Sequence, residues 1–277
     1  MKKIKTVTSY IVAEDNKQKE ITTFLEYNEQ EKLICSINYF SAEEIESKIV
    51  LKYDSAGNKT EEISYMSETE IDKHVYFKYD EKGNLLAEEI CYADGSKSVK
   101  TYTNKESEQW IETRDEDGEL EEKIYRKLKN NKDILEETVY DEEEKQTEKQ
   151  INTYDKENRL TNRLEFGRKN EFLAERKYTY NEAGKIIKRL SVNKKGKLID
   201  AIAYVYDDEG RILEQSLKNH LTIKYEYNKE EKTITEKRFL ANGIMASCMI
   251  SKFDENNLLV EEDNMISKKI YAYTFFE

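Results

Sequence analysis

The feature that most constrains this chain is a short phrase that recurs at a fixed interval. The phrase consists of an aromatic residue, then Asp or Asn, two variable residues, and in half of the clear copies Gly, as in Tyr53-Asp-Ser-Ala-Gly57. Within three runs of the chain the aromatic residues are spaced by 26 positions. The eight clear aromatic anchors are Tyr27, Tyr53, Tyr79, Tyr154, Tyr180, Tyr206, Tyr227 and Phe253. A constant period of this length predicts a repeat architecture of about ten units.

Two units are less regular copies, and a third is shorter than the rest. Stepping back 26 residues from Tyr154 reaches Leu128, and the segment from Tyr102 supplies the unit before it. From Tyr206 to Tyr227 the interval is only 21 residues. Because this loss falls where a turn is expected, we predict a short hairpin near Lys218 to His220, with the array continuing beyond it.

The repeated phrase is typical of a tight turn between two strands. Asp or Asn follows each anchor and opens turns through side-chain bonds to the backbone. Gly or Asn stands four residues after six of the eight anchors, and these two residue types tolerate positive φ. The predicted left-handed turn residues are Gly57, Gly83, Asn158, Gly184, Gly210 and Asn257.

A second turn is expected about half a period after the first. Segments such as Tyr92-Ala-Asp-Gly and Leu240-Ala-Asn-Gly mark it. The flanking segments of roughly seven residues are rich in Tyr, Ile, Thr and Val and alternate with period two, which favours β-strands. We therefore predict one all-β domain over residues 1–277, an antiparallel hairpin array of about twenty strands that forms a meander-like or solenoid-like, elongated or curved sheet. Whether this sheet stays open or closes into a shell is left undecided by the sequence. A helical turn stays open only for Asp141 to Gln150.

Composition excludes several classes of protein. Charged residues make up 38% of the chain and apolar residues 37%, with a net charge of −12. The 20 Tyr and 9 Phe argue against disorder, because disordered chains are poor in aromatic residues. The acidic balance disfavours nucleic acid and anionic membrane surfaces as partners. No apolar run approaches the ~20 residues of a membrane helix, so membrane insertion is not expected.

The repeated phrase resembles the YD repeat of Rhs-type bacterial surface and toxin proteins and of the animal teneurins. The resemblance rests on Tyr53-Asp54…Gly57, Tyr79-Asp80…Gly83-Asn84-Leu85, Tyr180-Asn181…Gly184 and Tyr206-Asp207…Gly210, in phase along most of the chain. It implies long β-hairpin arrays that spiral into shells and act as scaffold or container. It also implies a place in the bacterial cell envelope or outside the cell. No apolar stretch of signal-peptide length follows the basic start of this chain.

Few residues point to catalysis, a metal or a cofactor. His74 and His220 are the only histidines, which excludes a zinc motif with two neighbouring histidines. Acidic pairs such as Glu61-Glu62 and Glu136-Glu137 could suggest a glycosidase, but neighbouring strand residues face opposite sides of a sheet. Three widely spaced Cys form neither a disulfide framework nor a zinc signature. We therefore expect no enzyme activity, no metal and no cofactor.

The aromatic anchors are the candidate ligand-binding residues. Stacked at one position of successive units, they form a ladder that could hold a glycan or a peptide, although such a ladder is more often the packing face of a sheet. The ladder residues are Tyr53, Tyr79, Tyr154, Tyr180, Tyr206 and Tyr227.

Two function classes follow from the sequence. The first is a non-catalytic repeat scaffold that binds a protein or carbohydrate. The second is a fragment or relative of an Rhs-type shell that encloses a toxin polypeptide. An open sheet of about twenty strands would be roughly 95 Å long. Its radius of gyration should then clearly exceed the ~19 Å of a compact chain of this length. The oligomeric state stays open.

Overall fold

A computed structural model describes residues 2–13, 19–42, 44–130, 132–218 and 220–277. Nearly all regular structure in it is β-strand, with a single 3-10 turn, η1 (Arg168–Asn170). The first eleven strands are β1 (Ile4–Ala13), β2 (Lys19–Tyr27), β3 (Leu33–Ser41), β4 (Glu44–Tyr53), β5 (Lys59–Tyr65), β6 (Ile71–Tyr79), β7 (Leu85–Tyr92), β8 (Lys97–Lys105), β9 (Glu108–Asp115), β10 (Leu120–Lys129) and β11 (Asp133–Tyr140). The others are β12 (Gln146–Tyr154), β13 (Leu160–Phe166), β14 (Phe172–Tyr180), β15 (Ile186–Val192), β16 (Leu198–Tyr206), β17 (Ile212–Leu217), β18 (Leu221–Asn228), β19 (Thr233–Leu240), β20 (Met245–Phe253), β21 (Leu259–Asp263) and β22 (Ser267–Phe275).

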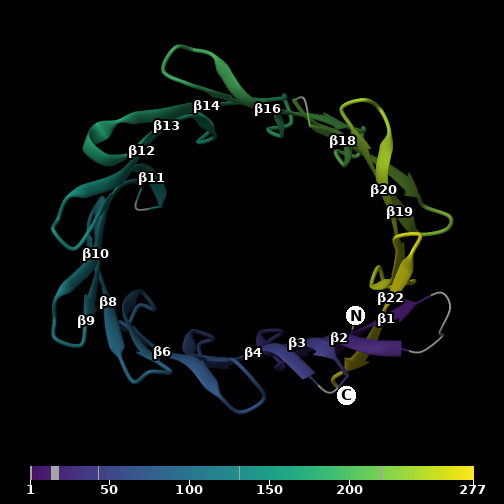
Figure 1. Cartoon of the computed structure of the whole chain (residues 1–277), viewed down its shortest axis with the longest axis horizontal. Helices are drawn as coiled ribbons and strands as arrows, with labels where there is room; N and C mark the ends of the chain where they lie inside the picture. Colours follow the sequence, from purple (N-terminus) through teal and green to yellow (C-terminus); the bar gives the residue numbers. More distant parts are fainter. Residues whose placement is uncertain (1, 14–18, 43, 131, 219) are drawn as a thin grey trace.

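Each strand pairs antiparallel with its neighbours in sequence, and the last strand pairs with the first. The pairing of β22 with β1 runs from Ile4 opposite Phe275 to Ala13 opposite Ser267. All 22 strands thereby form one closed sheet, a barrel that we call the ring. Its strands make the wall, and no strand crosses its centre (Figure 1). The predicted all-β antiparallel fold is correct at this level, and the sheet is a closed ring rather than an open meander or a solenoid.

An irregularity beside the anchors gives a physical reason for closure. Tyr53 pairs with Lys59 while Lys52 pairs with Glu61, so Thr60 is an extra residue that bulges from β5. The same register shift follows Tyr27, Tyr79, Tyr154, Tyr180, Tyr206 and Phe253. A β-bulge bends its strand and increases the local twist. Repeated at regular steps around the sheet, this bend brings β22 back to β1.

The closed ring has a thin wall and an open centre. At ~4.8 Å per strand, 22 strands give a circumference of about 105 Å and a diameter of at least 34 Å, too wide for side chains to fill. The accessible surface is 18062 Å², against about 12,500 Å² for a compact protein of 32.9 kDa. The buried residues within the described ranges are Ser9, Ile63, Val75, Ser98, Ile111, Thr138, Asn152, Ala174, Ile202 and Cys248. They lie singly along the wall, so stability depends on contacts between neighbouring strands.

One segment that the sequence left open, and one predicted as a short hairpin, are both β-structure. Asp141 to Gln150 forms a turn and the start of β12, with no helix. The short unit after Tyr206 is a reduced hairpin in which β17 pairs with β18 from Leu217 opposite Leu221 to Glu214 opposite Lys224. Within that hairpin, Asn219 lies outside the described residues. The sheet continues through β18 and β19 beyond it.

The ring has two faces, one on each side of the sheet, and two rims, one at each end of the strands. Because strand direction alternates, successive turns lie on alternate rims. The tyrosine face is the side of the sheet that carries the anchor aromatics, and the other side is the opposite face. The tyrosine rim consists of the turns that follow even-numbered strands, directly after the anchors. The opposite rim consists of the turns that follow odd-numbered strands. These four surfaces position all the candidate sites.

Candidate functional site: the tyrosine ladder and its gaps

The anchor tyrosines connect each repeat to the one before it. Tyr180 ends β14, and its hydroxyl donates a 2.7 Å hydrogen bond to the carbonyl oxygen of Leu160, the first residue of β13. The equivalent bonds measure 2.7–2.9 Å for Tyr53, Tyr79, Tyr154, Tyr206, Tyr227 and Tyr273. Burial raises the pKa of the Tyr180 phenol, which keeps it protonated as a donor. The ladder is therefore a series of clamps across the sheet.

A basic side chain from the preceding turn covers most of these rings. The Arg211 guanidinium lies 4.3 Å from the ring centroid of Tyr227, and the Lys185 ammonium lies 5.4 Å from that of Tyr206. Lys32, Lys129 and Arg159 make the same contact with Tyr53, Tyr154 and Tyr180. Such cation–π contacts contribute about 0.5–1 kcal/mol at exposed sites. Lys32 also donates to the Gly57 carbonyl at 2.6 Å, so the base joins two successive turns.

The predicted ladder residues thus occupy equivalent positions, and their hydroxyls are already bonded to backbone. Ligand binding by the ring faces stays a prediction. Sequence reasoning missed Tyr273, because Thr rather than Asp or Asn follows it. It also missed the basic residues. For Lys32, Arg159, Lys185 and Arg211 the signal is a Lys or Arg directly before the strand that follows the turn, whereas Lys129 is the last residue of β10.

The predicted turn residues lie at positive φ. Gly184 has φ 75° and Asn158 has φ 62°. The others in this set are Gly57, Gly83, Gly210 and Asn257, between 62° and 84°. The Asp or Asn after each anchor completes the turn, as when the Asp54 carboxylate accepts the Asn58 backbone N–H at 2.8 Å. Hydrogen bonds from the Asn58 side chain and backbone lower the pKa of Asp54.

Two cavities lie on the tyrosine face, each beside a unit that has no tyrosine at the anchor position. One of about 530 Å³ adjoins Leu128, the unit without an anchor aromatic. Its wall includes Tyr102, Asn104 and Gln109, and Gln109 Nε2 donates to Asn104 Oδ1 at 2.9 Å. An aromatic ring beside amide groups suits a polar ligand with an apolar side, such as a sugar or a peptide.

The second cavity, of about 380 Å³, lies between the last two anchors in the clear series. Tyr227 and Phe253 form its aromatic walls, and Arg211 and Lys232 stand among its lining residues. Phe253 has no hydroxyl, so this unit cannot make the clamp. The cavity therefore adjoins a unit whose anchor residue does not make the tyrosine hydrogen bond.

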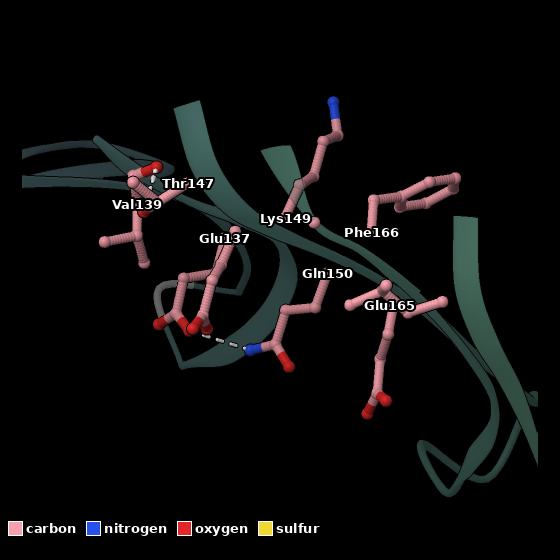
Figure 2. Close-up of a pocket in the computed structure, with 10 residues that line it drawn as sticks. Glu137, Val139, Thr147, Lys149, Gln150, Glu165 and Phe166 are labelled. Carbon is pink, nitrogen blue, oxygen red and sulfur yellow. Dashed lines mark hydrogen bonds between the residues drawn. The ribbon is translucent and has the colours of Figure 1, made fainter. Parts of the chain in front are cut away.

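A third cavity, of about 390 Å³, is rich in carboxylates (Figure 2). Glu137, Gln150 and Glu165 stand opposite one another on β11, β12 and β13 and point to one side of the sheet, whereas Lys149 and Phe166 point to the other (Figure 2). These carboxylates are already paired. Arg126 Nε lies 2.5 Å from Glu137 Oε2, Gln150 donates to Glu137 at 2.9 Å, and Arg176 lies 2.9 Å from Glu165.

The acidic pairs noted in the sequence are distributed over both faces. Glu61 contacts Lys52 at 3.0 Å and His74 at 2.9 Å on the opposite face, whereas Glu62 contacts Lys59 at 2.6 Å on the tyrosine face. A hydrogen bond from Lys52 lowers the pKa of Glu61, which favours the ionised form. Such carboxylates are strand-face ion-pair partners.

The described residues contain neither a metal-binding cluster nor a membrane-spanning helix. There, no group of three or more His, Cys, Asp or Glu side chains is arranged to hold a metal ion. In the same ranges, no helix has the length and apolar character to cross a membrane.

Comparison with known proteins gives likenesses of fold only. No protein-family profile matches the chain, and no curated protein sequence matches it. Among solved structures, the crystal structure of TcdB2-TccC3-Cdc42 is 11% identical, with a TM-score of 0.43 over 90% of this chain. This chain spans 15% of that protein's length. A porin-like protein from Bacteroides uniformis ATCC 8492 is 12% identical, with a TM-score of 0.37 over 98% of both chains. At these TM-scores neither likeness bears on function, which is therefore inferred from the chain's own geometry.

Proposed function

We propose that the chain is a non-catalytic β-repeat scaffold that binds a protein or glycan partner. The observation that carries this proposal is the open ring, whose surface of 18062 Å² leaves both faces of one sheet accessible. A wall built for catalysis would need a buried, preorganised pocket. Here the sheet offers broad, shallow surfaces, which suit an extended macromolecule.

The state of the ionisable groups agrees with a binding role. General acid–base catalysis needs a group free to exchange its proton with substrate. Glu137 and Glu165 are each paired with an arginine, and His74 is bonded to Glu61. These ion pairs and hydrogen bonds give the three side chains a structural role in the sheet. We infer that the protein is not an enzyme.

The second candidate is a relative of an Rhs-type shell that encloses a polypeptide. Closure of the sheet around an open centre supports enclosure. However, an enclosing wall should present a mainly apolar concave face to an unfolded guest. Charged residues stand in mid-strand on both faces, such as Arg126 and Glu137 on the tyrosine face and Lys149 on the opposite face. This favours the scaffold that binds at discrete sites.

Membership of the YD-repeat group and a place outside the cytoplasm are further parts of the proposal. The in-phase array of turns and the equivalence of the tyrosine clamps from unit to unit support the membership, and the proposed location rests on that membership. The candidate binding sites are the ladder and its two gaps beside Leu128 and Phe253.

Binding to glycan and peptide arrays tests the proposed function. The intact chain should bind one of the two classes saturably and leave it chemically unchanged. Asn104→Ala with Gln109→Ala should weaken binding about tenfold or more, a loss of about 1.4 kcal/mol, if the gap at Leu128 is the site. Thr103→Ala, on the opposite face of the same strand, is the matched control.

Lys232→Ala tests the second gap in the same way. Failure to bind either array, or turnover of a bound probe, would contradict the proposal. Binding unaffected by all three substitutions would place the site elsewhere on the ring.

A further inference from the structure

Two neighbouring turns of the opposite rim carry exposed basic side chains. These cations are Arg168 and Lys169 in the β13–β14 turn and Lys194, Lys195 and Lys197 in the β15–β16 turn. Arg168 lies 3.7 Å from Asp141, and the other four make no ion pair with a residue that the structure describes. Glu171 is the only acid within the two turns. Like charges at neighbouring positions repel, so this cluster, on a chain of net charge −12, is suited to an anionic partner.

An exposed aliphatic side chain accompanies each basic turn. Leu173 and Ile199 are 51% and 56% exposed, and each is the extra residue of a β-bulge near the start of β14 or β16. Leu173 lies against its own turn, because a Cβ added at Gly167 would be 3.5 Å from both of its methyl carbons. The basic patch consists of Arg168, Lys169 and Leu173 in one repeat and Lys194, Lys195 and Ile199 in the next, each 26 residues after its equivalent.

The basic patch is limited to these two turns, which are described in full. In the β11–β12 turn, one repeat earlier, the positions of the basic pair hold Glu142 and Glu143, and Thr147 takes the aliphatic position. On the other side, the turn of the reduced β17–β18 hairpin includes Asn219, which lies outside the described residues, and the patch does not extend to it. Because β14 and β16 both pair with β15, the two basic turns are two strand steps apart, about 9.6 Å.

We propose that the basic patch binds an acidic amphipathic helix of a partner protein. Cations beside aliphatic side chains match a surface that carries carboxylates and apolar side chains together. A nucleic acid or an anionic glycan would pair with the cations and leave Leu173 and Ile199 in water. Single-stranded nucleic acids also bind by stacking their bases on aromatic rings. The aromatic rings of this rim, Phe166 and Phe172, instead pack edge to face on each other, with their centroids 5.8 Å apart.

The distance between the two turns favours a helix over an extended peptide. Seven residues of an α-helix rise about 10.5 Å and complete two turns, so residues i and i+7 lie on one face at nearly the spacing of the patch. An extended strand covers this distance in three residues, and its residues i and i+3 point to opposite faces. The partner helix would therefore place apolar residues i and i+7 on Leu173 and Ile199, with carboxylates beside them on the cations.

This inference rests on the proposed function only in treating the ring as a scaffold for partners. It assigns a site on the opposite rim, whereas the ladder and its two gaps lie on the tyrosine face. The two sites can therefore be tested separately.

Fluorescence anisotropy with a synthetic helix tests the patch. The probe is a labelled peptide of about 18 residues with Leu at every seventh position and Glu on either side of each Leu. A scrambled peptide of the same composition is its control. The intact chain should bind the probe saturably, and about tenfold more tightly than the scrambled peptide.

Charge reversal at the patch should weaken binding of the probe. Lys194→Glu with Lys195→Glu should raise the dissociation constant about tenfold or more, because two cations become anions facing the carboxylates. Lys82→Glu with Lys156→Glu is the matched control, since it gives the same net charge but alters exposed turns of the tyrosine rim. This control should leave the dissociation constant unchanged, and circular dichroism should show both variants folded.

Ile199→Asn separates an amphipathic helix from a general polyanion. It should weaken the probe about tenfold and leave binding of a single-stranded DNA oligonucleotide unchanged, because all the charges remain. No saturable binding of the probe, equal binding of probe and scrambled peptide, tighter binding of the DNA, or a probe affinity that neither rim variant changes would each overturn the proposal. Asn104→Ala with Gln109→Ala should not affect the probe, so the array experiment at the gap beside Leu128 judges the proposed function independently.

Discussion

At the scale of single residues, the chain replaces a hydrophobic core by a repeated polar contact. Only a few residues in the described ranges are buried, and they are separated along the wall. The tyrosine hydroxyl adds cohesion by donating a hydrogen bond to the carbonyl at the start of the neighbouring strand, as Tyr180 on β14 does to Leu160 on β13. A hydrogen bond of this kind contributes about 1 kcal/mol, and seven such bonds act around the ring.

Tyr180→Phe should lower the free energy of unfolding by about 1 kcal/mol, because the Leu160 carbonyl loses its donor while the ring stays. Denaturant unfolding measures the change. Tyr92→Phe is the matched control, since Tyr92 is 41% exposed and a surface change should stay within about 0.5 kcal/mol. Equal effects at the two sites would show that the clamp does not stabilise the sheet.

The free energy of unfolding should fall in acid, because the turn carboxylates become protonated. Hydrogen bonds from the Leu258 and Asn256 backbone lower the pKa of Asp254. A lowered pKa in the folded state means that the stabilisation is present above the ordinary Asp range and is lost as the pH falls through the folded value, below about pH 4. Asp254→Asn keeps the acceptor, as Asn181 does for the Lys185 N–H, and should make unfolding less sensitive to acid.

Asp208→Asn serves as its control, because in the described part of the chain the Asp208 side chain makes no hydrogen bond or ion pair. The free energy of unfolding, followed from neutral pH to about pH 3, should have the same pH dependence in this variant as in the wild type. If Asp254→Asn also leaves that dependence unchanged, the turn carboxylates do not cause the acid sensitivity.

At the scale of elements, the left-handed turn residue fixes where each hairpin reverses. Gly184 has φ 75°, and a Cβ added there would meet nothing within 4 Å. A larger side chain would therefore be opposed by backbone strain alone. Gly184→Val should cost about 1–3 kcal/mol in stability, and Gly184→Asn clearly less, since Asn158 and Asn257 occupy the same slot. If thermal unfolding shows Val and Asn to be equivalent, the turn does not depend on the left-handed residue.

Elements were predictable from sequence because their signals are local. The Tyr-Asp-x-x-Gly phrase marks a strand end and a turn within five residues, and alternation marks the strands between. The bulge after Tyr53 has no such signal, since Thr60 looks like any other strand residue. The acidic character of the cavity at Glu137 also has no local signal in the sequence. Glu137, Gln150 and Glu165 become neighbours only through the register of three paired strands.

At the scale of the whole molecule, closure is a sum of small bends. Periodicity specifies only that each strand pairs with the next, and it contains no information about the partner of the first and last strands. Most of the hairpins that follow an anchor contribute a bend through a bulge, and 22 strands complete the circle. The pairing of β1 with β22 spans nearly the whole chain, so the sequence could not decide between an open sheet and a closed ring.

Removal of one whole period should preserve the ring. Excision of Asp155 through Tyr180 deletes β13 and β14 and joins Tyr154 to Asn181 in the same register, because Tyr154 pairs with Leu160 as Tyr180 pairs with Ile186. The circumference should fall by about 10 Å, which small-angle scattering detects as a smaller radius of gyration. Nearest-neighbour contacts dominate in repeat arrays, so the shorter chain should stay folded.

Excision of the single strand Ile186–Val192 is the control. It leaves an odd number of strands and reverses the direction of every later one, so the chain should unfold or aggregate. A folded single-strand deletion beside a collapsed whole-period deletion would mean that the repeats do not act as independent units.

A disulfide across the seam between β1 and β22 tests ring closure most directly. In a chain whose native cysteines are replaced by Ser, Thr8→Cys with Ala272→Cys and Ser9→Cys with Tyr271→Cys sit at adjacent paired positions, one of which has the close spacing of a non-hydrogen-bonded pair. Mild oxidation of dilute protein should cross-link at least one pair within single chains, whereas Thr8→Cys with Ala203→Cys on β16, across the ring, should stay reduced. Seam pairs that cross-link no more than this distant pair would show that the sheet is open and would contradict the ring.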